Sequence, residues 1–173
     1  MPFLISGRIR RPHPTTTKQM KILILGAGNL LLSDEGFGVH FIRHLEKNYK
    51  LPGNVELFDA GTMGIMVTHK IEEADRVYII DVINADGKPG TCLRYSKEDF
   101  MLKQIPVKMS PHQIGIQEML LVSEMRGHCP KQLYLLGVIP ESTGPGNELS
   151  SVLQKSLVHL AKDLVNELGG TAL

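Results

Sequence analysis

The sequence has no tryptophan, only two cysteines and no apolar run long enough to span a bilayer. The cysteines, Cys92 and Cys129, supply neither a disulfide framework nor a C-x-x-C metal or redox motif. Without a long apolar segment, the chain is predicted to be soluble, with no membrane partner. With 42% hydrophobic residues in 173 positions, it can bury the core of one domain.

Acidic residues are missing from positions 1–19. This segment carries three arginines, one lysine, several prolines and a run of threonines, so we expect a disordered basic extension there. Residues 20–173 hold 15 basic and 18 acidic side chains, a net charge of −3, which argues against nucleic-acid binding. Met20 directly precedes the first apolar segment. We therefore expect a single domain over 20–173 and a dispensable tail over 1–19.

Short apolar segments alternate with amphipathic ones from residue 21 onwards. Strands are predicted at 21–25, 55–59, 77–81, 91–95 and 132–139, and helices at 37–45, 64–74, 113–125 and 149–168. Such alternation is typical of a mostly parallel sheet covered by helices on both faces. The connection 82–90 is too short for a crossover helix, so the strand after it should run antiparallel. The predicted fold class is α/β, a three-layer sandwich with a mixed, mostly parallel five-stranded sheet.

A glycine is absent where a dinucleotide-binding loop needs one. The segment after the first strand begins Gly26-Ala27-Gly28, but Leu31 occupies the last glycine position of the G-x-G-x-x-G fingerprint. Asp59, at the end of the second strand, would suit a ribose hydroxyl. A nucleotide-binding α/β module therefore remains an alternative. It needs a glycine at position 31, which is absent, and an acidic residue at the end of the second strand, which Asp59 supplies.

Three residues of metal-ligand type are expected at the same edge of the sheet. Glu35 follows the first strand, Asp81 ends the third, and the segment 96–111 is long enough to return His112 to that edge. Two carboxylates and one imidazole suit zinc, nickel or manganese and leave open positions for water or substrate. Local roles are the alternative: Glu35 and Asp34 can complement a helix dipole, Asp81 can cap or pair locally, and His112 can be an ordinary helix-start residue.

Two further patterns contain residues of functional type, and the first of them lies at this edge. The turn 59–64 has the sequence Asp-Ala-Gly-Thr-Met-Gly. It is either a tight connection between strand and helix or one wall of a crevice that admits a peptide backbone. His40 and His44 have a ligand spacing on a helix, but they lack the glutamate of H-E-x-x-H and are expected to be a solvated surface pair. No G-x-S-x-G nucleophile elbow is present.

Five segments, in order, carry a resemblance to a known family. They are GAGNLLLSDEGFG at 26–38, DAGT at 59–62, ID at 80–81, SPHQ at 110–113 and GVIPE at 137–141. Together they closely resemble the hydrogenase maturation endopeptidases, over a span from Met20 to about Leu168. One position departs from the family pattern: the turn usually reads Asp-Gly-Gly-Thr, and Ala60 replaces its first glycine.

The resemblance implies a cytoplasmic endopeptidase that removes a C-terminal peptide from the large-subunit precursor of a nickel–iron hydrogenase. It implies a divalent metal, most simply the nickel already carried by that precursor, no nucleotide, and a monomeric enzyme. The metal can polarise the scissile carbonyl or activate water, or a carboxylate can act as general base. A non-catalytic chaperone that only holds the precursor is a further alternative. The implied roles are metal binding by Glu35, Asp81 and His112, catalysis by Asp81 and Glu35, and substrate recognition by Asp59, Gly61 and Thr62.

Overall fold

The computed structural model of the chain describes residues 19–101 and 111–173, without the side chains of residues 100, 101 and 111–114. The basic tail predicted at 1–19 lies, except for its last residue, outside the described residues. In chain order the elements, with 3₁₀ turns written η, are β1 (Ile22–Ala27), η1 (Ser33–Gly36), α1 (Phe37–Asn48), β2 (Tyr49–Lys50), β3 (Val55–Gly61), η2 (Gly64–Val67), α2 (Thr68–Glu72), β4 (Arg76–Val82), β5 (Cys92–Ser96), α3 (Lys97–Met101), α4 (Pro111–Met125), β6 (Gln132–Val138), α5 (Ser151–Leu168) and β7 (Thr171–Ala172).

Five strands form one sheet in the order β3-β1-β4-β6-β5. β1 pairs in parallel with both β3 and β4, and β4 pairs in parallel with β6. β5 runs antiparallel to β6, because the short connection from β4 contains no crossover helix. The register sets Gly26 of β1 opposite Ile80 of β4, so the carboxyl ends of these two strands are neighbours. The predicted mixed sheet is confirmed.

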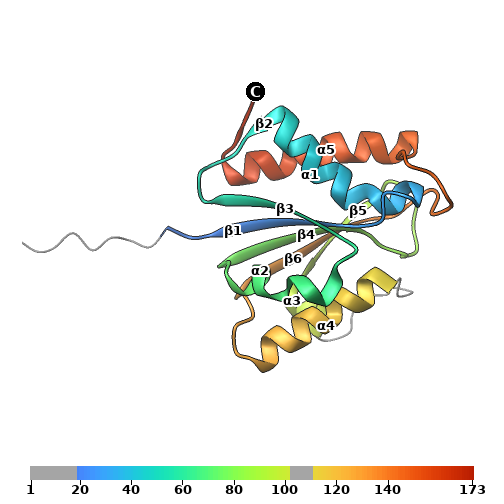
Figure 1. The fold of residues 1–173 in the computed structure, drawn as a ribbon. Helices are drawn as coiled ribbons and strands as arrows, with labels where there is room; N and C mark the ends of the chain where they lie inside the picture. The colour runs from blue at the N-terminus through green and yellow to red at the C-terminus, as the bar shows by residue number, and fades with distance from the viewer. Residues whose placement is uncertain (1–18, 102–110) are drawn as a thin grey trace, which may run out of the picture.

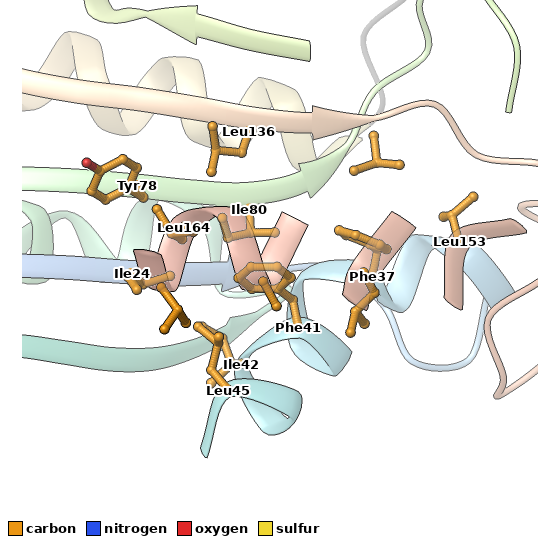
Figure 2. Close-up of a cluster of buried hydrophobic side chains, with 14 of the residues drawn as sticks. Ile24, Phe37, Phe41, Ile42, Leu45, Tyr78, Ile80, Leu136, Leu153 and Leu164 are labelled. Carbon is orange, nitrogen blue, oxygen red and sulfur yellow. The ribbon is translucent and has the colours of Figure 1, made fainter. Parts of the chain in front are cut away.

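Helices cover both faces of the sheet, giving three layers (Figure 1). α1 and α5 pack on one face, while α2 and α4 pack on the other. Strand side chains alternate between the faces: Ile24 of β1 points to the α1/α5 layer, and Leu25 points to the α2/α4 layer. Figure 2 shows the first of these cores, where Phe37 and Phe41 of α1 pack against the sheet. Each such side chain stabilises the fold by roughly 1.5–3 kcal/mol when it is fully buried.

Some elements differ from the sequence prediction. The helix predicted at 64–74 is divided into η2 and α2, since Gly64 begins it with a positive φ of 51° and the first turn is 3₁₀. α3 and the short pairing of β2 with β7 were not predicted. α5 starts after the cap residue Ser150 and ends at the left-handed Gly169, close to the predicted bounds. Among the described residues, no helix has the length and apolar character that membrane crossing requires.

Candidate active site at the carboxyl edge of the sheet

The glycine loop after β1 packs its backbone directly on the start of α1. A Cβ atom at Gly28 would collide with the carbonyl oxygen of Glu35, and one at Gly26 would collide with the carbonyl oxygen of Gly38. The backbone N–H of Asn29 donates to the same Glu35 oxygen at 2.9 Å. The glycines therefore position Glu35 by close backbone contact. Because Glu35 occupies the space over Gly28 that a pyrophosphate would need, this geometry disfavours the nucleotide-binding alternative.

Asp81 has one carboxylate oxygen without a described partner. Its side chain is 1% exposed, and Oδ1 accepts a hydrogen bond from the backbone N–H of Val82 at 2.8 Å. Oδ2 is buried and accepts no hydrogen bond from any described residue. Burial raises the pKa of Asp81 well above its usual value, the Val82 bond opposes this, and the negative charge of Glu35 raises the pKa further. Glu35 is thus close enough for its charge to act on Asp81.

A cation is the partner that this pair of carboxylates fits. A buried anionic oxygen without a donor is costly, and a second carboxylate nearby adds repulsion. A divalent metal offsets both effects and prefers carboxylate oxygens or imidazole nitrogens as ligands. The structure therefore brings Glu35 and Asp81 together at the predicted edge and gives them an environment suited to a metal.

His112 is the second residue of α4, as the sequence predicted for a helix start. α4 begins at the end of the molecule where β1 and β4 finish (Figure 1). The side chain of His112 lies outside the described residues, so its contact with a metal stays a prediction. Among the described side chains, no three of His, Cys, Asp and Glu cluster as a metal site, a finding that does not extend to His112.

Asp34 has a role that sequence reasoning missed. Its carboxylate is fully buried and accepts three backbone hydrogen bonds: Oδ2 binds the N–H groups of Glu141 at 2.9 Å and Ser142 at 3.0 Å, and Oδ1 binds that of Ser150 at 2.7 Å. Asp34 thereby fastens the segment 141–150 to the turn that carries Glu35. The local helix-dipole role considered for Asp34 does not account for these three bonds, because their donors lie more than a hundred positions away in the chain.

The turn after β3 is closed by its own aspartate. Asp59 is exposed, and its Oδ1 accepts a hydrogen bond from the N–H of Gly61 at 3.0 Å. Gly61 has a positive φ of 48°, which favours glycine at this position. Arg43 of α1 lies 4.0 Å from Asp59 Oδ2. Asp59 and the exposed Thr62 lie at the carboxyl end of β3, and their role in substrate recognition stays a prediction.

His40 and His44 differ from the solvated pair that was expected. They line a groove of about 630 Å³ between α1 and α5, in which the Nε2 atoms of both are inaccessible. Burial lowers the pKa of both histidines, because it disfavours the charged imidazole. Asn48 Nδ2 lies 3.2 Å from Nδ1 of His44. The expectation failed because the segment before α5, including Leu149, covers this face of α1.

Comparison with known proteins identifies the family. The family model HycI, described as hydrogenase maturation protease, matches residues 39–167, well over half of the chain. This chain belongs to the hydrogenase maturation protease family. The resemblance seen in its sequence motifs is thereby confirmed.

The family relatives extend along most of the chain. The hydrogenase 2 maturation protease of Escherichia coli K12 is 39% identical over 131 residues, covering 73% of this chain and 77% of the relative. The hydrogenase expression/formation protein HupD of Bradyrhizobium diazoefficiens is 39% identical over 128 residues, and the chain spans 66% of its length. The solved structure of the hydrogenase maturating endopeptidase HybD from Escherichia coli matches with a TM-score of 0.79 at 34% identity, covering 89% of this chain and 97% of HybD.

Proposed function

We propose that this hydrogenase maturation protease is an endopeptidase that removes a C-terminal peptide from the nickel-loaded large-subunit precursor of a nickel–iron hydrogenase. The observation that carries the proposal is the buried Oδ2 of Asp81, which has no hydrogen-bond partner among the described residues and lies beside Glu35, at the sheet edge where open α/β folds bind ligands. Membership of the hydrogenase maturation protease family supports a peptidase activity for the chain that carries this carboxylate pair. The cytoplasmic location and monomeric state expected from the resemblance stay predictions.

The proposed roles follow from the position of each group. Asp81 and Glu35 supply carboxylate oxygens to the nickel that the precursor carries, and His112 supplies a nitrogen from the first turn of α4. The ion, when bound, polarises the scissile carbonyl or activates a water molecule. One of the two carboxylates accepts the proton that the attacking water loses, and Asp81 is our first choice because its second oxygen has no described donor.

Three protein ligands do not fill the coordination sphere of a divalent metal. The precursor must then bring the remaining ligands together with its nickel. On this basis the enzyme binds free nickel modestly and nickel-loaded precursor much more tightly. Nickel insertion in the precursor thus becomes the signal that permits cleavage.

The decisive experiment compares two forms of one precursor. The purified enzyme is mixed, without added metal, with nickel-loaded precursor or with nickel-free precursor, and the products are weighed by mass spectrometry. We expect loss of the C-terminal peptide from the nickel-loaded form alone. Equal cleavage of both forms would contradict a substrate-borne metal. A stable complex with no change in precursor mass would support the chaperone alternative instead.

A set of variants tests the assigned groups. Asp81→Asn, Glu35→Gln and His112→Ala should each lower cleavage by about 100-fold or more, the scale of a lost acid–base group, while melting near the wild-type temperature. Asp86→Asn is the matched control, because this carboxylate lies exposed in the loop that follows β4. Variants that unfold would favour local structural roles for these residues, and full activity of His112→Ala would remove His112 from the site.

A further inference from the structure

An apolar pocket of about 180 Å³ lies on the α2/α4 face of the sheet. Its walls come from four elements that the topology brings together: Leu25 and Ala27 of β1, Ala60 of β3, Val67 of η2, and Ile116 and Met119 of α4. All six side chains belong to the core of that face. None of the described residues that line the pocket is charged. Thr62 contributes the one polar side chain among the described lining residues, so the chemistry of the pocket mainly suits an apolar group.

The pocket begins beside Asp81. Gly26 and Ile80 are partners in the pairing of β1 with β4, so the next residues along, Ala27 and Asp81, lie side by side on neighbouring strands. Side chains alternate along a strand, and Ile79 and Ala27 belong to the same core, so Asp81 and Ala27 point to the same face. The wall that α4 contributes starts at Gly115, about one turn after His112. A substrate held by the carboxylates would therefore have this pocket beside it.

Small residues keep the pocket open. Five of its ten lining residues are glycine or alanine, so main chain rather than side chain forms much of its rim. Gly64 and Gly115 face each other, and a Cβ atom at Gly115 would lie 3.2 Å from the Cα atom of Gly64. An engineered aliphatic cavity of about 150 Å³ stays dry and binds benzene. A pocket of this size and character therefore holds one apolar side chain, from valine to phenylalanine in size.

Exposed apolar side chains surround the turn that forms one wall. Met63 and Ile65 are each 43% exposed, and Met66 is 76% exposed. All three lie within or beside η2, next to the wall residues Gly64 and Val67. Exposed apolar groups gathered beside a pocket are typical of a surface that contacts another polypeptide. The occupant is thus a side chain presented on a protein and not a free small molecule.

We propose that this apolar pocket is a specificity subsite, which binds one apolar side chain of the precursor next to the bond that is cleaved. The assignment rests on the proposed endopeptidase function and adds to it the class of residue that the enzyme selects. Binding of that side chain positions the scissile bond against Glu35 and Asp81. Burial of one apolar side chain also makes the enzyme prefer substrates with an apolar residue at this position. Binding of the metal alone does not provide this preference.

The experiment changes the pocket and the substrate together. A panel of nickel-loaded precursors carries Ala, Val, Leu, Phe or Asp in turn at each residue flanking the cleaved bond, and kcat/KM is measured for each. Ala60→Val narrows the pocket, and Val67→Ala widens it. Met125→Ala is the matched control, because Met125 is 80% exposed at the far end of α4.

For the wild type, Asp should lower kcat/KM by about 10-fold or more at one flanking position, and the aliphatic residues should be preferred there. Ala60→Val should shift the preference at that position towards Ala by about 10-fold, and Val67→Ala should shift it towards Phe, while Met125→Ala leaves it unchanged. If Ala60→Val does not fold, the shift in Val67→Ala decides alone.

Two different results would overturn the assignment. Wild-type cleavage that is indifferent to these residues, or folded pocket variants that cleave with an unchanged preference, would remove the pocket as a subsite and leave the endopeptidase function intact. A folded wild-type enzyme that leaves every nickel-loaded precursor whole would instead contradict the proposed function, and the pocket assignment would fall with it.

Discussion

The carboxylate of Asp34 lies 2.7 Å from the backbone nitrogen of Ser150, which is 116 positions further along the chain. The same side chain binds the amides of Glu141 and Ser142, so one buried anion organises the segment between β6 and α5. Backbone bonds reinforce this link, since the N–H of Ser33 donates to the carbonyl of Gly146 at 2.8 Å. Glu35 directly follows Asp34, so the turn that carries Glu35 is held to the segment between β6 and α5.

We expect Asp34→Asn to destabilise the protein by about 2–3 kcal/mol, because an amide cannot accept all three bonds and leaves a buried N–H without a partner. Urea unfolding measures the change. Glu35→Gln is the comparison and should leave the unfolding free energy within about 0.5 kcal/mol of the wild type. Equal stability of the two variants would show that the three Asp34 bonds do not hold the segment.

Gly38→Ala should be among the more damaging single changes in the chain. A Cβ atom at Gly38 would collide with the carbonyl oxygens of Ala27 and Ile80, so the start of α1 would have to move away from the sheet. We expect a loss of about 3 kcal/mol, the upper part of the range for overpacking. Gly53→Ala is the control, since nothing lies within 4 Å of a Cβ atom there, and it should be neutral or slightly stabilising. Thermal melting of the two variants tests the difference.

Replacing both His40 and His44 by Gln should leave cleavage and metal binding unchanged, because the groove they line is separate from the Glu35–Asp81 pair. The pH dependence of stability should change. Burial holds the pKa of both histidines below 6.5 in the folded protein, so the unfolded chain binds protons first and the wild type loses stability as the pH falls below about 6.5.

The double variant should lose less stability than the wild type between pH 7 and pH 5, as measured by urea unfolding at each pH. Parallel curves would contradict burial of the histidines. Loss of metal binding at wild-type stability would mean that these histidines, and not His112, serve the metal.

Glu167 should contribute stability that disappears in acid. Arg94 donates to it through two nitrogens at 2.8 and 3.1 Å, and the Tyr78 hydroxyl donates at 2.6 Å. These bonds, Arg94 first, hold the pKa of Glu167 below 4.5. A carboxyl group whose pKa is lower in the folded protein than in the unfolded chain stabilises the fold at pH values above its unfolded pKa. This stabilisation is lost as the pH falls through its folded pKa.

Glu167→Gln should therefore be less stable than the wild type by a constant amount above about pH 5, with the gap closing below pH 4.5. The exposed Glu46→Gln on α1 serves as the control for replacing a surface glutamate. Thermal melts across the acid range provide the measurement. A gap that persists unchanged at the lowest pH would assign the effect to packing of the side chain.

The fold was predictable because local signals decide it. Alternation of strands and helices predicts the parallel sheet, and the short connection before Cys92 predicts the one reversed strand. Glu35 and Asp81 could be assigned to one edge of the sheet because Asp81 lies near the end of β4 and Glu35 lies in the turn that follows β1.

What could not be predicted depends on contacts between distant segments. Asp34 reads as an ordinary acidic residue at a helix start, since its three donors lie 107–116 positions away. The apolar pocket has no sequence signal, because Leu25, Ala60 and Met119 read simply as core residues on three separate elements. The pairing of β2 with β7 joins two strands that lie more than a hundred positions apart, and each has only two residues, too short for any periodic pattern.

The contact between Gly64 and Gly115 bears on how relatives of this enzyme can diverge. It lets η2 touch α4 through backbone alone, so a side chain at Gly115 would press on η2 and push the helix outward. Because His112 lies in the first turn of that helix, such a shift would carry His112 with it. With the apolar pocket as the proposed specificity subsite, we expect new substrate preferences to arise most easily through side chains of β3 and η2, such as Ala60 and Val67. Relatives that vary there can change substrate preference while α4, which carries His112 in its first turn, keeps its place.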